Sequence, residues 1–307
     1  MRVRLTLDYR TGVLLEEEAA KYNLSVNGLI NRIVSCSEEL KPRLYKIDKE
    51  NVKKDVKINA RNKMIWNEVL CKYDDASASE LLRGYVSSYL LLPIYLRENI
   101  VYRDIINQIN FAKDNKKSLK IKYSKDGYGH EERKIDPYVI VTTQSEENNY
   151  LIAYCHKRKD IRNFRISRIE SVKNCKTEFF VKDRYKEIIE RAKKYFDGFL
   201  SYNQYVKIEF TEVGLGMLNR LTLNKPIEIS KEDIIKEPDV YSGVSISEKD
   251  IENEKIKVFE CSEYQCEAYF FQYLENILIL EPSSARNRMY EKLTKSIEKI
   301  KEISENE

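Results

Sequence analysis

The residues best suited to chemistry are cations gathered in residues 148–169, NNYLIAYCHKRKDIRNFRISRI. Two apolar segments, 150–155 and 164–169, flank a loop, and Asp160 is the only acid in the whole stretch. Short apolar runs on either side of a polar loop are typical of paired strands, so we expect a rigid β-scaffold to hold the cations. The pattern predicts a fixed anion-binding surface made by Lys157, Arg158, Lys159, Arg162, Arg165 and Arg168.

The distribution of charge supports the same surface. The whole chain of 307 residues has a net charge of only +4, whereas residues 113–176 contain 16 Lys or Arg against 9 Asp or Glu. The positive field is therefore concentrated on this segment, as expected for a surface that attracts nucleic acid. The alternative interpretation is that Lys-rich loops only solvate a β-barrel.

The same residues carry a family resemblance. Asn149-Tyr150-Leu151 occupies the place of a Trp-Tyr-Leu run, and R-x-F-R-x-x-R-I follows at residues 162–169. The flanks LKIKY at 119–123 and RKIDPYVIV at 133–141 agree with it. Residues from about 100 to 182 thus resemble a WYL domain, which implies a small SH3-like (Sm-like) β-barrel that binds a negatively charged ligand, often nucleic acid. Asn149 departs from the family, because it replaces an aromatic residue and removes stacking at that position.

Aromatic faces combined with arginines are what single-stranded nucleic acid requires, since bases stack and phosphates need cations. His156 is expected to form a hydrogen bond to ligand or backbone rather than to act in catalysis. The alternatives are that some tyrosines belong to the core, as alternation requires for Phe164 and Ile166, and that some arginines pair with carboxylates. The candidate ligand-binding residues are Tyr123, Arg133, Lys134, Tyr138, Tyr150, His156, Arg158, Arg162, Arg165 and Arg168.

The N-terminal 95 residues resemble a tandem ribbon-helix-helix module. A strand at 2–7, a helix at 11–22 and a helix capped by Ser25 are followed by a similar series at 56–60, at 62–73 and after Ser77. Such modules close a two-stranded ribbon that can enter the major groove of DNA. The alternative is a ribbon that serves only as a scaffold, because residues 16–18, 74 and 75 are acidic. Possible DNA-facing residues of the ribbon are Arg2, Arg4, Thr6, Lys57 and Asn59.

The expected fold class is multidomain α+β. After the N-terminal module (1–95) and the WYL domain with its leading helix (96–182), a connector helix (183–204) precedes a C-terminal α+β extension (205–307). We expect a homodimer, because this extension has more apolar surface than one small core needs. The apolar residues concerned are Tyr269, Phe270, Tyr273, Leu274, Leu293, Ile297, Ile300 and Ile303.

Enzymatic chemistry has no support in the sequence. None of the phosphate-loop, dinucleotide-binding, metalloprotease or nucleophile-elbow motifs occurs, and the chain has only two histidines. The six cysteines form no C-x-x-C pair, so we expect reduced thiols, no metal site and no cofactor. No apolar run approaches the length of a membrane span, and the N-terminus lacks an apolar signal segment, so a cytoplasmic protein is expected.

The combined arrangement resembles accessory proteins encoded beside type VI-D CRISPR RNA-guided RNases. That resemblance implies a non-enzymatic protein that binds single-stranded RNA, or single-stranded DNA, and modulates the effector nuclease. The alternative function is a DNA-binding transcription regulator whose WYL domain senses an anionic nucleotide.

Overall fold

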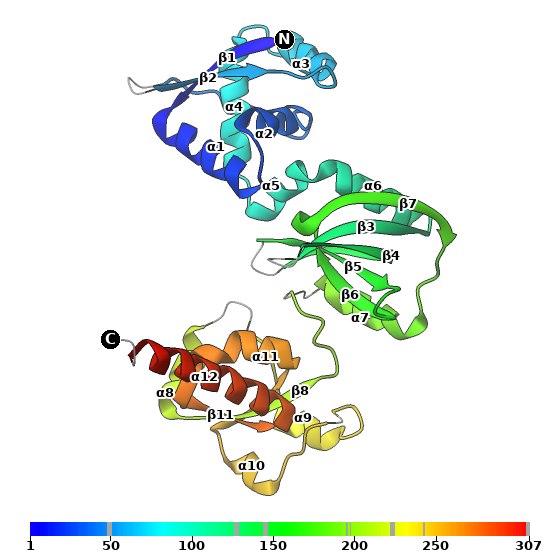
Figure 1. Ribbon diagram of the computed structural model, residues 1–307, viewed down its shortest axis with the longest axis vertical. Coiled ribbons are helices and arrows are strands. Elements are labelled where there is room, and N and C mark those ends of the chain that lie inside the picture. The colour runs from blue at the N-terminus through cyan, green and yellow to red at the C-terminus, as the bar shows by residue number, and fades with distance from the viewer. Residues whose placement is uncertain are drawn as a thin grey trace. The chain divides into compact units, whose positions relative to one another are not determined.

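The computed structural model describes residues 1–47, 51–125, 129–143, 147–194, 196, 198–221, 225–241 and 243–304. The chain is a mixed α+β protein with three antiparallel sheets in this described part (Figure 1). It divides into two compact units, Met1–Val181 and Lys182–Glu307.

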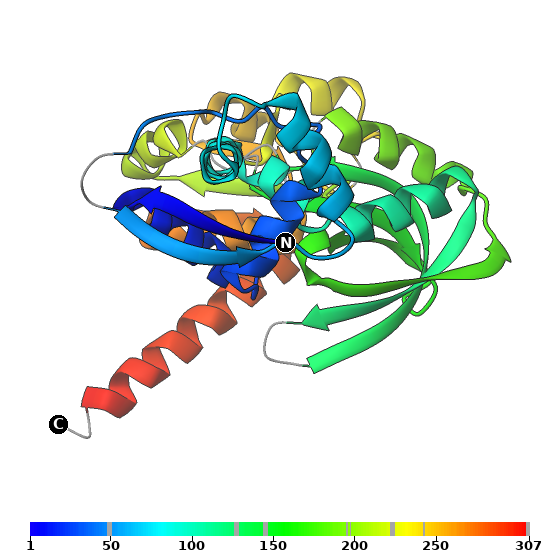
Figure 2. The same cartoon turned by 90° about the horizontal axis from the view of Figure 1, so that it is seen from above.

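The first unit begins with a two-stranded ribbon. Strands β1 (Arg2–Asp8) and β2 (Asn51–Lys57) pair antiparallel and run side by side in Figure 2. Alternation along β1 buries Val3, Leu5 and Leu7 and leaves the other face outward. The second strand, expected at residues 56–60, instead covers residues 51–57. The sequence conceals its beginning because Lys54, on the inner face, interrupts the apolar alternation; Lys54 pairs there with Glu16.

Four helices share one core with the inner face of the ribbon, and two of them begin at the predicted serine caps. Ser25 Oγ accepts a hydrogen bond from Gly28 N, and Ser77 with Glu80 forms a reciprocal capping box. Trp66 and Tyr85 lie fully inside this core with their rings edge to face. The helices are α1 (Tyr9–Lys21), α2 (Val26–Val34), α3 (Lys63–Lys72) and α4 (Ala78–Leu90).

Two further helices connect this part to the next sheet. Helix α5 (Ile94–Val101) contributes Ile100 and Val101 to the first core, so the boundary expected at residue 95 falls inside a helix that packs with the N-terminal elements. Helix α6 (Arg103–Asp114) places Ile109 and Ala112 in the core of the following sheet.

The second sheet has the strand order β6-β5-β4-β3-β7. The segment 164–169, expected as one strand, instead divides between the end of β6, a 3-10 turn η1 (Ile166–Arg168) and the start of β7. Among the described residues β6 and β7 are not paired, so the closed barrel stays a prediction. The strands are β3 (Lys117–Lys125), β4 (Gly129–Thr142), β5 (Asn149–Cys155), β6 (Asp160–Arg165) and β7 (Ile169–Glu178).

The second unit contains a four-stranded sheet in the order β11-β8-β10-β9, which packs against helices. Tyr269, Phe270 and Tyr273, expected as dimer surface, are buried in this unit's own core, so that part of the expectation is wrong. In the last helix Ile297 and Ile300 are exposed. The elements are α7 (Asp183–Lys194), β8 (Tyr205–Phe210), α8 (Glu212–Arg220), β9 (Ile227–Ile229), α9 (Lys231–Lys236), α10 (Glu248–Glu252), β10 (Ile256–Glu260), α11 (Glu263–Phe270), η2 (Phe271–Asn276), β11 (Ile277–Glu281) and α12 (Ser283–Ser304).

Candidate nucleic-acid interface

Four of the predicted ligand-binding residues come together where β5 begins and β6 ends. The register of the two strands puts Tyr150 directly opposite Arg165, and the backbone N of Arg165 donates to Tyr123 Oη over 3.3 Å. Burial raises the pKa of Tyr150, and the nearby cations of Arg165 and Arg168 oppose that rise. We call these residues, Tyr123, Tyr150, Arg165 and Arg168, the tyrosine–arginine cluster.

The local backbone explains why the two arginines act together. Ile166 is fully buried and anchors the 3-10 turn that follows Arg165. Arg165 is the extended last residue of β6 and precedes the turn, whereas Arg168 ends it; both cations lie near enough to Tyr150 to act on its pKa. Arg165 is half-buried, and its Nε has no hydrogen-bond partner within the described part of the chain. Because this Nε is buried as well as unpaired, an incoming phosphate would have to bind the outer nitrogens of the guanidinium.

A buried polar contact fixes the beginning of β5 against α5. Glu98, which is 2% exposed, accepts hydrogen bonds from the backbone N of Asn149 (2.6 Å) and from its Nδ2 (2.8 Å). Asn149 Nδ2 also donates to the carbonyl of Tyr95, and its Oδ1 accepts from Thr142 Oγ1. Burial raises the pKa of Glu98, while the bonds from Asn149 and the Arg165 cation act in the opposite direction. The asparagine at the position of the family's aromatic residue is thus a structural link between α5 and the sheet.

His156 belongs to a second polar group on the same sheet. Its Nε2 lies 2.8 Å from Asp136 Oδ1, which also accepts a 2.6 Å hydrogen bond from the buried Ser118 hydroxyl. The side chain therefore contacts a carboxylate, whereas the sequence predicted a hydrogen bond to ligand or backbone. Lys134 lies nearby in β4, and its Nζ donates to Thr177 Oγ1 over 3.3 Å.

Two predicted binding residues are buried instead of lying on the surface. The ring of Tyr138 is 8% exposed and packs against Phe179 at a centroid distance of 5.9 Å, so it offers no open face for a base. Arg133 is 6% exposed and forms an ion pair with Glu131. Positions 133 and 138 are an odd number of residues apart, so simple alternation would put them on opposite faces of β4. The register shift between Pro137 and Val139 interrupts that alternation, and both side chains are buried.

The remaining predicted arginines of the sheet lie on the β5–β6 hairpin. Arg158 and Arg162 are exposed, and Arg162 lies 3.8 Å from Asp160. The hairpin is positive, but neither arginine adjoins a tyrosine of the cluster in the strand register.

The ribbon forms a separate basic surface. Cross-strand partners on its outer face are Arg2 with Lys57, Arg4 with Asp55, and Thr6 with Lys53. Lys53 and Asp55 lie outside the strand expected at residues 56–60, so the sequence did not predict them as members of this face. Asn59 lies beyond the end of β2, and its Oδ1 accepts from the backbone N of Asn62, so this amide is engaged in the turn before α3.

The acidic residues that argued against a DNA-binding ribbon are partly neutralised. Glu16 pairs with Lys54, and the buried Glu18 lies 2.8 Å from Arg97 and accepts a hydrogen bond from Tyr89 Oη. These two carboxylates therefore contribute little repulsion toward a phosphate backbone.

The described part of the chain contains no helix that is both long enough and apolar enough to cross a membrane. Of the six cysteines, all free, four are buried, Cys175 is half-buried and Cys71 is exposed.

Comparison with known proteins identifies a family for the middle of the chain and solved structures of similar fold. Residues 104–174 match the family model described as WYL domain. No curated protein matches the sequence. A solved structure described as a "CRISPR Cas-related protein" has 15% identity and a TM-score of 0.68, over 98% of this chain and 94% of that chain. A second solved structure, the proteasome accessory factor B/C (PafBC) of Arthrobacter aurescens, has 18% identity over 92% of this chain and 45% of that chain, but its TM-score of 0.30 carries no argument.

Proposed function

We propose that this WYL-domain protein is a non-enzymatic, cytoplasmic nucleic-acid-binding regulator that takes single-stranded RNA on the tyrosine–arginine cluster. The observation that supports this function is the meeting of Tyr123 and Tyr150 with Arg165 and Arg168 at one end of a rigid sheet. Tyrosine faces suit base stacking and the two guanidinium groups suit phosphates, a combination that single strands require and duplexes do not.

The partner that we propose for this activity is a CRISPR RNA-guided RNase, which the protein would modulate without cutting RNA itself. The support is the likeness in fold, over nearly the whole chain, to a structure described as CRISPR Cas-related. In this proposal the N-terminal elements are a tandem ribbon-helix-helix module, and the second sheet is an Sm-like barrel.

The test is the salt dependence of RNA binding, measured by fluorescence anisotropy with a labelled single strand. Each phosphate contact in a single strand contributes a slope of about −0.7 in log affinity against log salt. Replacing both arginines of the cluster, Arg165→Gln and Arg168→Gln, should flatten the slope by about 1.4 and weaken binding at low salt.

A matched control separates this site from general positive charge. The pair Arg158→Gln and Arg162→Gln removes the same charge from the neighbouring hairpin and should change the slope by less than half as much. If both double variants flatten the salt slope equally, the cluster contributes only general positive charge to RNA binding. If the slope of the Arg165/Arg168 variant is unaltered, the cluster is not the binding site. Circular dichroism melting should show that both variants remain folded.

A second candidate function, duplex DNA binding in transcription control, is favoured by one observation. The outer face of the ribbon holds four cations, Arg2, Arg4, Lys53 and Lys57, against two acids, Asp8 and Asp55, in the cross-strand pairs. Changing Arg2 and Arg4 to Ala should flatten the salt slope on duplex DNA by about 1.8, at about −0.9 per contact, and leave single-stranded RNA binding nearly unchanged. If the Arg2/Arg4 variant keeps its salt slope on duplex DNA and loses RNA binding instead, the ribbon is not the DNA-binding element.

A further inference from the structure

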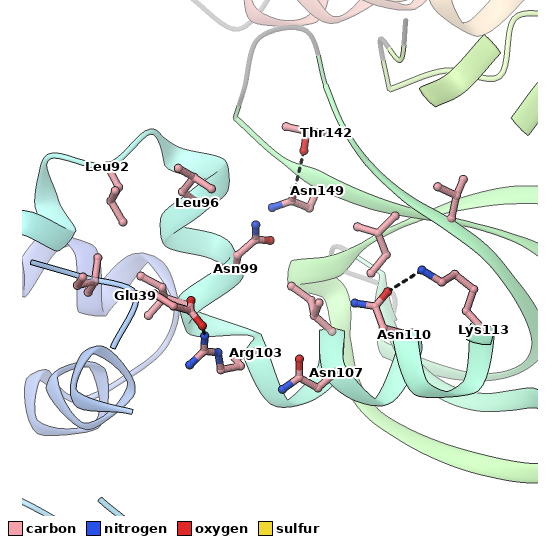
Figure 3. A pocket seen from close by; sticks show the side chains of 15 residues that line it. Glu39, Leu92, Leu96, Asn99, Arg103, Asn107, Asn110, Lys113, Thr142 and Asn149 are labelled. Atoms are coloured by element: carbon pink, nitrogen blue, oxygen red, sulfur yellow. Dashed lines mark hydrogen bonds and ion pairs between the residues drawn. The ribbon is translucent and has the colours of Figure 1, made fainter. Parts of the chain in front are cut away.

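A cleft of about 650 Å³ lies between helices α5 and α6 on one side and strands β4 and β5 on the other (Figure 3). Sites for small molecules usually have volumes of about 300 to 1,000 Å³. None of the four residues of the tyrosine–arginine cluster lines this cleft. It is therefore a site separate from the proposed RNA-binding surface.

The two walls of the cleft are largely aliphatic. Leu96 and Ile106 come from the helical wall, and Val139 and Ile140 come from β4. All four side chains are half-buried, so apolar surface remains open to the cleft. Facing aliphatic surfaces favour a flat, apolar-faced group such as a heteroaromatic ring.

The charged pair in the cleft already has partners. Arg103 forms an ion pair with Glu39 and donates to the carbonyl of Ser35 over 3.0 Å. On the opposite wall Thr142 Oγ1 donates to Asn149 Oδ1 over 2.9 Å. These groups satisfy one another, so a ligand gains little by displacing them.

Three side-chain amides remain available. Asn99 and Asn107 line the helical wall without any hydrogen-bond partner in the described residues, and Asn110 uses its Oδ1 to accept from Lys113 Nζ (3.2 Å), which leaves its NH₂ group open. An amide presents a donor beside an acceptor, and the edges of nucleobases present the complementary arrangement. Figure 3 shows these asparagines along the α5–α6 wall, with Lys113 beside Asn110.

We propose that this cleft binds a nucleoside monophosphate, with the base between the aliphatic walls and against the amides, and the phosphate at Lys113. Lys113 supplies the positive charge: its ion pair with Asp114 is long, 3.6 Å, whereas Arg103 is held by both Glu39 and the carbonyl of Ser35. A single cation suits one phosphate rather than a polynucleotide. A fatty acyl chain fits less well, because it would leave the amides unpaired.

The experiment is isothermal titration of the full-length protein with each of the four ribonucleoside 5′-monophosphates and with the four nucleosides. We expect at least one nucleotide to bind with a dissociation constant of about 1 mM or tighter. Asn99→Leu and Asn107→Leu should each weaken binding of that nucleotide about tenfold. Lys113→Ala should weaken the nucleotide about five- to tenfold and leave the corresponding nucleoside unchanged.

Two controls make the outcome decisive. Gln108→Leu changes an exposed amide of α6 that does not line the cleft, and it should leave the affinity unaltered. The Arg165→Gln/Arg168→Gln variant should also retain nucleotide binding, so the loss of RNA binding and the loss of nucleotide binding are distinguishable. The proposal is overturned if no nucleotide or nucleoside binds, or if binding disappears with the Arg165/Arg168 change while both asparagine variants bind like the parent.

Discussion

Replacing Asn149 by Ala tests whether the link between α5 and β5 holds the first unit together. The substitution removes three hydrogen bonds at a site that is 1% exposed: one from the amide to the Glu98 carboxylate, one to the Tyr95 carbonyl, and one accepted from Thr142. The backbone bond from Asn149 N to Glu98 stays, so the substitution isolates the contribution of the side chain.

The expected loss follows from the kinds of hydrogen bond removed. A bond to a charged group contributes about 1.5 to 3 kcal/mol, and a neutral one contributes about 0.5 to 1.5 kcal/mol. One of the former and two of the latter predict that the free energy of unfolding falls by about 2.5 to 6 kcal/mol. That is a large part of the roughly 5 to 15 kcal/mol that a domain has.

The chain provides its own probe for this measurement. Trp66 is the single tryptophan and lies fully buried among the N-terminal helices, whereas Asn149 begins β5 of the second sheet. If the link couples the two parts, Asn149→Ala should shift the urea transition of Trp66 fluorescence as well as that of circular dichroism. Thr142→Val, which removes only one neutral bond, should shift both by about 0.5 to 1.5 kcal/mol.

Two outcomes would refute this reasoning. A loss below about 1 kcal/mol would mean that water replaces the asparagine without cost. A Trp66 transition that does not move, while the circular dichroism transition does, would mean that α5 does not transmit the stability of the sheet to the N-terminal core.

Three further predictions follow from the same structure. Burial raises the pKa of Glu98, so its contribution to stability should fall as pH rises from the ordinary carboxyl value through the raised value. Glu98→Gln should flatten the pH dependence of urea stability above the ordinary carboxyl value, and an unchanged profile would contradict the burial argument. The exposed Ile297 and Ile300 lie on the C-terminal part of α12, which extends away from the rest of its unit in Figure 2, so Ile297→Glu/Ile300→Glu should convert a homodimer to a monomer in light scattering, whereas Lys295→Glu should not. Residues 1–102 should fold alone as a monomer, because both ribbon strands and the core residues Ile100 and Val101 are present; a fragment that sediments as a dimer would contradict pairing of the ribbon within one chain.

The sequence predicts those features of the structure that depend on residues close together in the chain. The caps at Ser25 and Ser77 are as predicted, since a hydroxyl three residues before a free backbone N–H suffices. Phe164 and Ile166 are buried as alternation required. The match of residues 104–174 to the WYL domain is confirmed.

What the sequence concealed depends on contacts between distant segments. Glu98 and Asn149 are 51 positions apart, and the sequence around neither residue predicts that the Glu98 carboxylate accepts hydrogen bonds from Asn149. Strand β2 was placed late because Lys54, on its inner face, interrupts the apolar alternation and is compensated only by Glu16 from α1. The sequence around Tyr138 predicts a stacking face, because nothing near residue 138 reveals that Phe179, 41 positions later, covers its ring.

The pairing of β1 with β2 within one chain has a consequence for symmetry. When two identical chains form such a ribbon, its halves are the same and a duplex target must repeat itself about a two-fold axis. Here one strand presents Arg2, Arg4 and Thr6 while the other presents Lys57, Asp55 and Lys53. The two halves differ in charge and reach, so a duplex contacted by this ribbon has no reason to be palindromic, and each half can change without altering the other.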